Sequence, residues 1–104
     1  MGPYYVYILE CADKSFYVGF TNNVERRLEE HQTGFYENAY TNKRRPVRLL
    51  YHLQFTKAYQ ALQIEKQLKG WSRAKKIALM NGEFERLQML AECRNYTHVK
   101  YKPE

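Results

Sequence analysis

Two short runs near the N-terminus, both rich in β-branched and aromatic residues, constrain the fold more than any other feature. The first run extends from Tyr4 to Glu10 and the second from Phe16 to Phe20, and only Cys11 to Ser15 separates them. Such runs favour strands, and a short turn-like connection joins antiparallel neighbours. The pattern therefore predicts a β-hairpin. If the strands pair symmetrically about the turn, Tyr7 shares a face with Tyr17 and Gly19, because side chains alternate with period two.

The hairpin register has a consequence for two hydroxyl groups. Leu9, like Tyr7, would lie on the face that carries Tyr17 and Gly19. A glycine at this point leaves room beside the tyrosine hydroxyls, because it has no side chain. We therefore expect open space next to Tyr7 and Tyr17.

A helix is expected next, from Asn23 to Thr33. Asn22 is its predicted N-cap, with Glu25 three residues later, and Gly34 ends it. At 100° per residue, one stripe of this helix holds Val24, Arg27, Leu28 and His31. An arginine and a histidine are therefore expected to point inward.

The remainder of the chain predicts a third strand and further helices. Residues 35–46 have no clear period and are expected to form an exposed basic loop. The residues from Val47 to Phe55 alternate as in a half-buried strand, and one face of that strand would carry Val47, Leu49, Tyr51, Leu53 and Phe55. Helices are predicted over 57–69, from a Ser72 cap to Met80, and over 83–93. The expected fold class is α+β, a three-stranded antiparallel sheet flanked by helices.

Length and composition exclude several classes of protein. The chain has 104 residues, room for one compact domain, which we place at 1–93 with a frayed tail over 94–104. It contains no apolar run of the roughly 18–20 residues that a membrane span needs and no signal-peptide pattern, so we expect a cytoplasmic protein. Cys11 and Cys93 lack the spacing of a zinc site or a disulfide framework and are expected to be reduced and structural.

Charge indicates a polyanionic partner. The formal net charge is +6, and between Glu37 and Glu83 the only acid is Glu65, against ten basic residues: Lys43, Arg44, Arg45, Arg48, Lys57, Lys66, Lys69, Arg73, Lys75 and Lys76. A basic surface of this kind suits nucleic acid.

Three charged or titratable residues occupy predicted apolar stripes: Arg27, His31 and Glu65. A buried charge is usually paired, bound to a metal or placed at the lip of a cleft, because leaving it unpaired costs several kcal/mol. One explanation is an Arg27–Glu65 ion pair that supports the fold, in which case Glu65→Ala would cost about 3–5 kcal/mol. His31 alone is more often a packed histidine than a catalyst.

The order of these residues adds a resemblance to a known family. Tyr5-Val6-Tyr7 and Tyr17-Val18-Gly19 resemble the two halves of the GIY-YIG nuclease motif, with Arg27 on the following helix and Glu65 on a later one. The resemblance extends over about residues 4–90 and is closest to small stand-alone bacterial members of unassigned role. Tyr5 stands where the family has glycine.

The resemblance implies an endonuclease that hydrolyses phosphodiester bonds in DNA, rather than RNA, with low sequence specificity. Glu65 would bind one Mg²⁺ or Mn²⁺, and Arg27 would contact the scissile phosphate. Tyr7, Tyr17 or His31 would deprotonate the attacking water, and the residues alone leave this choice open.

The nucleic-acid contacts are expected from Lys43, Arg44, Arg45, Arg73, Lys75 and Lys76. A protein partner would supply targeting, and no membrane partner is expected. The alternative is a non-catalytic nucleic-acid-binding module with the same fold.

Overall fold

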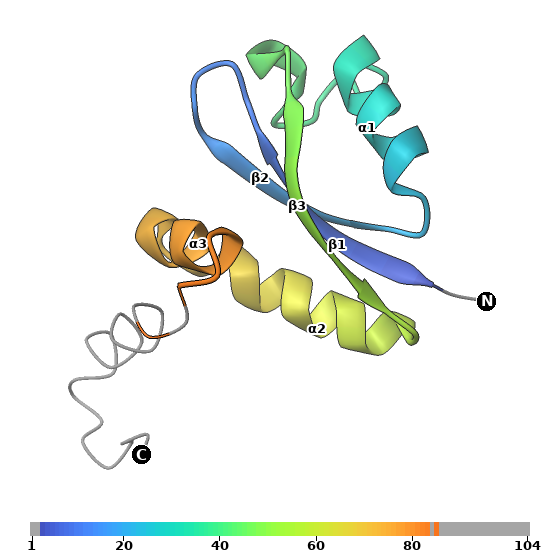
Figure 1. Cartoon of the computed structure of the whole chain (residues 1–104). Helices are drawn as coiled ribbons and strands as arrows, with labels where there is room; N and C mark the ends of the chain where they lie inside the picture. Colours follow the sequence, from blue (N-terminus) through green and yellow to red (C-terminus); the bar gives the residue numbers. More distant parts are fainter. Residues whose placement is uncertain (1–2, 84, 86–104) are drawn as a thin grey trace. The chain divides into compact units, whose positions relative to one another are not determined.

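The computed structural model describes residues 3–83 and 85. Figure 1 shows the order of its elements along the chain: β1 (Tyr4–Glu10), β2 (Phe16–Thr21), α1 (Val24–Thr33), the 3-10 turn η1 (Asn42–Arg44), β3 (Arg48–Phe55), α2 (Ala58–Lys69) and α3 (Arg73–Met80). The chain divides into two units, Met1–Gly70 and Trp71–Glu104. The first holds the sheet with α1 and α2, and α3 belongs to the second. The predicted helix over 83–93, Cys93 and the tail over 94–104 fall almost entirely outside the described residues, and the single domain over 1–93 stays a prediction.

The sheet confirms the predicted hairpin and fold class. Its strand order is β2-β1-β3, and both neighbouring pairs are antiparallel. Tyr7 is opposite Gly19 and Leu9 is opposite Tyr17, so these four residues share one face of the sheet as the alternation predicted.

Strand β3 departs from the predicted alternation because it contains a bulge. Leu49 is opposite Leu9, whereas Tyr51 is opposite Ile8, so Leu50 is one residue too many for the ladder. An extra residue reverses the faces beyond it. Leu49 therefore shares a face with Tyr7, while Tyr51 and the later apolar residues of the strand take the opposite face, and the prediction of one shared face was wrong.

Helices cover both sides of this sheet, with α1 on one side and α2 on the other in Figure 1. On the α1 side, a buried cluster of Tyr7, Leu9, Cys11 and Val47 packs against Leu28 of the helix. On the other side α2 packs against all three strands. Among the described residues, no helix has both the length and the apolar character needed to cross a membrane.

The ends of α1 match the prediction to within one residue. Asn23, rather than the predicted Asn22, is the N-cap, and its side chain accepts a hydrogen bond from the Arg26 amide. Gly34 ends the helix in the left-handed region at a φ of 75°, where glycine carries no Cβ penalty. Ser72 caps α3 as predicted.

Candidate active site

Tyr7 lies at the centre of the candidate site, and Gly19 makes its position possible. The Tyr7 side chain is 2% exposed. A Cβ built at Gly19 would lie 2.3 Å from both Cζ and Oη of Tyr7, far inside van der Waals contact. The absence of a side chain at Gly19 makes room for the Tyr7 ring, which fills that space, so the prediction of open space beside the Tyr7 hydroxyl was wrong.

A buried chain of hydrogen bonds continues from Tyr7. Its hydroxyl is 3.0 Å from His31 Nε2, and His31 Nδ1 is 2.7 Å from Thr41 Oγ1. His31 is 3% exposed and Thr41 is 1% exposed. Thr41 belongs to residues 35–46, so the prediction of a fully exposed loop was wrong at this residue, because the segment folds back onto α1.

The environment keeps Tyr7 and His31, the two titratable residues of this hydrogen-bond series, neutral near pH 7. Burial raises the pKa of Tyr7 well above its ordinary value, the Tyr17 phenol adds to the rise, and Arg27 opposes it. Burial lowers the pKa of His31, Arg27 lowers it further, and Glu30 opposes the decrease. A neutral imidazole has one donor nitrogen and one acceptor nitrogen. The hydrogen bond to Thr41 at Nδ1 therefore decides whether Nε2 accepts from Tyr7 or donates to it.

Arg27 reaches the same face of the sheet from α1. Its Nη1 donates to the Phe20 carbonyl at 3.3 Å, and its Cζ lies 5.6 Å from the centre of the Tyr36 ring. Its Nε lies 3.3 Å from Glu30 Oε1 but is buried and forms no hydrogen bond within the described residues. The Arg27 side chain is nevertheless 29% exposed, so a phosphate could reach the accessible part of its guanidinium.

Two residues that the sequence did not indicate complete this arrangement. The Tyr36 hydroxyl donates a hydrogen bond to Glu30, and this bond raises the pKa of Tyr36. Glu30 lies three residues after Arg27, which is the spacing of a helical ion pair and could have indicated it. No local pattern indicated Tyr36, which follows the helix-ending glycine.

A pocket of about 450 Å³ collects these groups. It is lined by Tyr17, Arg27, His31, Tyr36, Asn38 and Ala39. Tyr17 and His31 meet at its wall, where their ring centres are 5.1 Å apart. Tyr7 does not line the pocket but is joined to it through His31. The structure thus brings four of the predicted site residues together.

Glu65, the fifth predicted residue, lies on α2. Its carboxylate is 3.0 Å from Lys69 Nζ, and the Glu65 side chain is 17% exposed against 53% for Lys69. Arg27 is instead paired with Glu30. The Arg27–Glu65 ion pair was therefore a wrong expectation, since α1 and α2 lie on opposite sides of the sheet (Figure 1).

The oxygen donor at Glu65 fits magnesium better than zinc. The described residues contain no cluster of three or more His, Cys, Asp or Glu side chains that could hold a metal ion. Structural zinc needs such a cluster, whereas Mg²⁺ commonly takes one or two carboxylates and completes its shell with water and substrate phosphate. A single carboxylate in a basic region is compatible with such a Mg²⁺ site.

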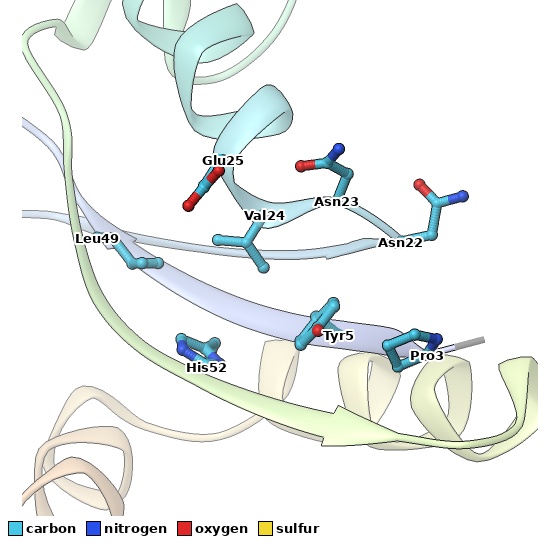
Figure 2. Close-up of a pocket in the computed structure, with 8 residues that line it drawn as sticks. All are labelled: Pro3, Tyr5, Asn22, Asn23, Val24, Glu25, Leu49 and His52. Carbon is cyan, nitrogen blue, oxygen red and sulfur yellow. The ribbon is translucent and has the colours of Figure 1, made fainter.

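A second pocket, of about 460 Å³, opens beside the start of α1 on the same face of the sheet. Figure 2 shows its lining residues, Pro3, Tyr5, Asn22, Asn23, Val24, Glu25, Leu49 and His52. Tyr5 and His52 meet edge to face at 5.8 Å. The lining includes a carboxylate and neither lysine nor arginine, so this pocket is poorly suited to a phosphate.

The predicted nucleic-acid-binding residues differ in their surroundings. Lys43 is exposed, and Arg44 pairs with Asp13 at 3.2 Å. Arg45 is exposed and donates to the Asn42 carbonyl at 2.8 Å.

The three candidates on α3 form a separate group. Arg73 is exposed and Lys76 is partly buried. Lys75 is buried, with Nζ 4.2 Å from the centre of the Trp71 ring. Its ammonium group is therefore not presented at the surface.

Comparison with known proteins gives the family. The GIY-YIG catalytic domain matches residues 3–78. A UPF0213 protein of Syntrophus aciditrophicus is 47% identical over 88 residues, which are 84% of this chain and 100% of the relative. The solution structure of the UPF0213 protein BH0048 from Bacillus halodurans is 40% identical, with a TM-score of 0.51, over 77% of this chain and 84% of that one. The solution structure of EF2693 from E. faecalis is 30% identical, with a TM-score of 0.52, over 100% of this chain and 95% of that one. This chain, like its small UPF0213 relatives, belongs to the GIY-YIG family.

Proposed function

We propose that this protein is a divalent-metal-dependent endonuclease that hydrolyses phosphodiester bonds in DNA with low sequence specificity. Membership of the GIY-YIG family points to nuclease chemistry and to a nucleic-acid substrate. The observation that carries the proposal is the pocket in which Tyr17 and His31 lie beside the partly exposed side chain of Arg27. Such a pocket has an anion-binding group next to candidate proton acceptors, as phosphodiester hydrolysis requires.

Arg27 is the proposed phosphate ligand. Hydrolysis adds negative charge to the phosphate oxygens in the transition state, and a guanidinium fixed beforehand stabilises that charge without having to reorganise. The bond from Nη1 to the Phe20 carbonyl and the contact with Tyr36 hold the group in place. Glu30, whose Oε1 lies 3.3 Å from Arg27 Nε, offsets part of the charge.

Tyr17 is the proposed general base, and Tyr7 the residue that positions it. Tyr7 is almost fully buried and its raised pKa disfavours the phenolate. Both nitrogens of His31 are already hydrogen-bonded. Tyr17 lines the pocket, and its hydroxyl has no hydrogen-bond partner within the described residues. A water in the pocket could therefore transfer a proton to Tyr17 Oη when the phenol is deprotonated.

Glu65 is the residue proposed to hold Mg²⁺ or Mn²⁺, through its carboxylate. Such a cation supplies Lewis-acid stabilisation of phosphate oxygens when it is bound. Lys69, which now pairs with that carboxylate, is half-exposed and can turn to solvent.

Plasmid nicking tests this function. Supercoiled plasmid is incubated with Mg²⁺ or Mn²⁺ and the parent protein, Glu65→Ala or Arg27→Ala, with an EDTA control and thermal unfolding of each variant. We expect metal-dependent nicking by the parent and none by either folded variant. Nicking that survives in EDTA or in folded Glu65→Ala would refute the proposed metal role.

The alternative is a nucleic-acid-binding module without catalysis. The exposed cations Lys43 and Arg45 support binding under either hypothesis. Under the alternative, a folded parent nicks neither DNA nor RNA with any divalent cation, yet binds both with steep salt dependence.

A further inference from the structure

The segment that follows α1 is tied to the helix and to itself by hydrogen bonds although it has little regular structure. The Phe35 amide donates to the Glu30 carbonyl at 3.0 Å, and Asn42 Nδ2 lies 3.2 Å from the Gly34 carbonyl and 3.3 Å from that of Tyr36. Thr41 is tied to His31 in the core. These hydrogen bonds place the backbone of the segment beside the pocket, which Tyr36, Asn38 and Ala39 line.

Two large rings on the same segment face solvent. Phe35 is 66% exposed and Tyr40 is 43% exposed. Phe35 contacts the pocket residue Tyr36 edge to face at 5.0 Å, and Tyr40 stacks on the pocket residue Tyr17 at 6.2 Å with 18° between the rings. The exposed rings therefore extend the pocket wall outward at two points.

Cations accompany these rings. Arg44 Cζ lies 3.9 Å from the centre of the Tyr40 ring. Lys43 and Arg45 are both exposed, and within residues 3–83 neither lies within ion-pair distance of a carboxylate. Aromatic faces alternating with positive charge can bind bases and phosphates of one strand at the same time.

We propose that Phe35 stacks an unpaired nucleobase, so that the substrate of this pocket is nucleic acid that is unpaired at this point, whereas the Tyr40 ring is already stacked against Tyr17 and Arg44. The inference rests on the proposed function, because it concerns the same pocket. In a duplex each base is covered by its neighbours, whereas a single strand can turn a base face onto a protein ring. Phe35 has no polar group to contact a duplex backbone, and its exposed ring therefore suits a base.

The test measures binding in EDTA, so that no cleavage intervenes. Fluorescence anisotropy compares a labelled oligothymidylate with a mixed-sequence duplex of the same length, for the parent, Phe35→Ala, Phe35→Trp and Tyr59→Ala. Tyr59 is a matched control, because it is 65% exposed and lies on α2, on the other side of the sheet from α1.

We expect Phe35→Ala to weaken oligothymidylate binding about tenfold, in line with the loss of one stacked base, while duplex binding is unchanged. Phe35→Trp should keep parental affinity, and so should Tyr59→Ala. The inference is overturned if Phe35→Ala binds oligothymidylate like the parent, if it loses equal affinity for both forms, or if Tyr59→Ala has the same effect.

The binding assay tests the stacking surface and the nicking assay tests the nuclease, so either claim can fail while the other holds. Loss of single-strand binding in Phe35→Ala by a protein that never cleaves would support the stacking surface and refute the nuclease. Metal-dependent cleavage, together with oligothymidylate binding that is unchanged in Phe35→Ala, would support the nuclease and refute the stacking surface.

Discussion

Gly19→Ala should destabilise the protein through one contact, the collision with Tyr7. The added Cβ would lie 2.3 Å from Tyr7 Cζ and Oη and 2.9 Å from Cε1, so the ring has to move. The Tyr7 ring is buried and has no free space in which to move. Forcing an extra methyl group into a packed core costs about 1–3 kcal/mol.

A displaced ring also loses its hydrogen bond to His31. A buried polar group left without its partner costs about 1–3 kcal/mol more. The lower backbone entropy of alanine in the unfolded chain returns about 0.4–1 kcal/mol. We therefore expect Gly19→Ala to lower the free energy of unfolding by about 2–5 kcal/mol, from the sum of these terms.

A double-mutant cycle with Tyr7→Leu identifies the cause. Leucine lacks the ring atoms that the new Cβ would touch, so Gly19→Ala should be nearly neutral in the Tyr7→Leu background. The free energies come from urea unfolding followed by far-ultraviolet circular dichroism, and the coupling energy should equal nearly the whole cost of Gly19→Ala, about 2–5 kcal/mol. An equal cost in both backgrounds would show that the destabilisation does not arise from Tyr7.

Further predictions concern the proposed site and its hydrogen bonds. Tyr17→Phe should abolish metal-dependent nicking while leaving DNA affinity in EDTA unchanged, and retained nicking would exclude Tyr17 as the base. Thr41→Val should cost about 1–3 kcal/mol, because it removes the partner of buried His31 Nδ1, whereas Thr41→Ser should recover most of that loss in urea unfolding. Burial lowers the pKa of His31 below 6.5, so as the pH falls below that value the unfolded chain binds this proton before the folded chain does. The free energy of unfolding should therefore decrease from about pH 6.5 downward, and it should decrease less steeply in His31→Gln. Glu65→Ala should change thermal stability by no more than about 0.3–0.5 kcal/mol, since its partner Lys69 is half-exposed, and a loss several times larger would mean that Glu65 has a structural role.

Much of the fold could be predicted because its determinants are local. The strands of the hairpin, the register that unites Tyr7 with Tyr17, and the end of α1 at Gly34 all follow from alternation and glycine within a few residues. The GIY-YIG motifs lie on these same local elements. The family and the face that carries Tyr7 and Tyr17 were therefore predictable from the sequence.

The remaining features depend on contacts between distant residues. The bulge at Leu50 appears only when β3 pairs with β1, and it reverses the face of every later residue in the strand. The exclusion of Arg27 as the partner of Glu65 also needs the tertiary structure, because α1 and α2 lie on opposite sides of the sheet, whereas the Lys69 pair is a local contact four residues along the same helix.

The sequence by itself determined the hairpin, its register and the helix that carries Arg27 and His31, because the periodicity and capping that specify them are written in neighbouring residues. Only the tertiary structure decided that Thr41 hydrogen-bonds His31, that Tyr36 lines the pocket, and that Tyr7 is buried while Tyr17 is accessible. The reason is physical: burial and long-range hydrogen bonds depend on which segments pack together, and no local pattern in residues 35–46 specifies that packing.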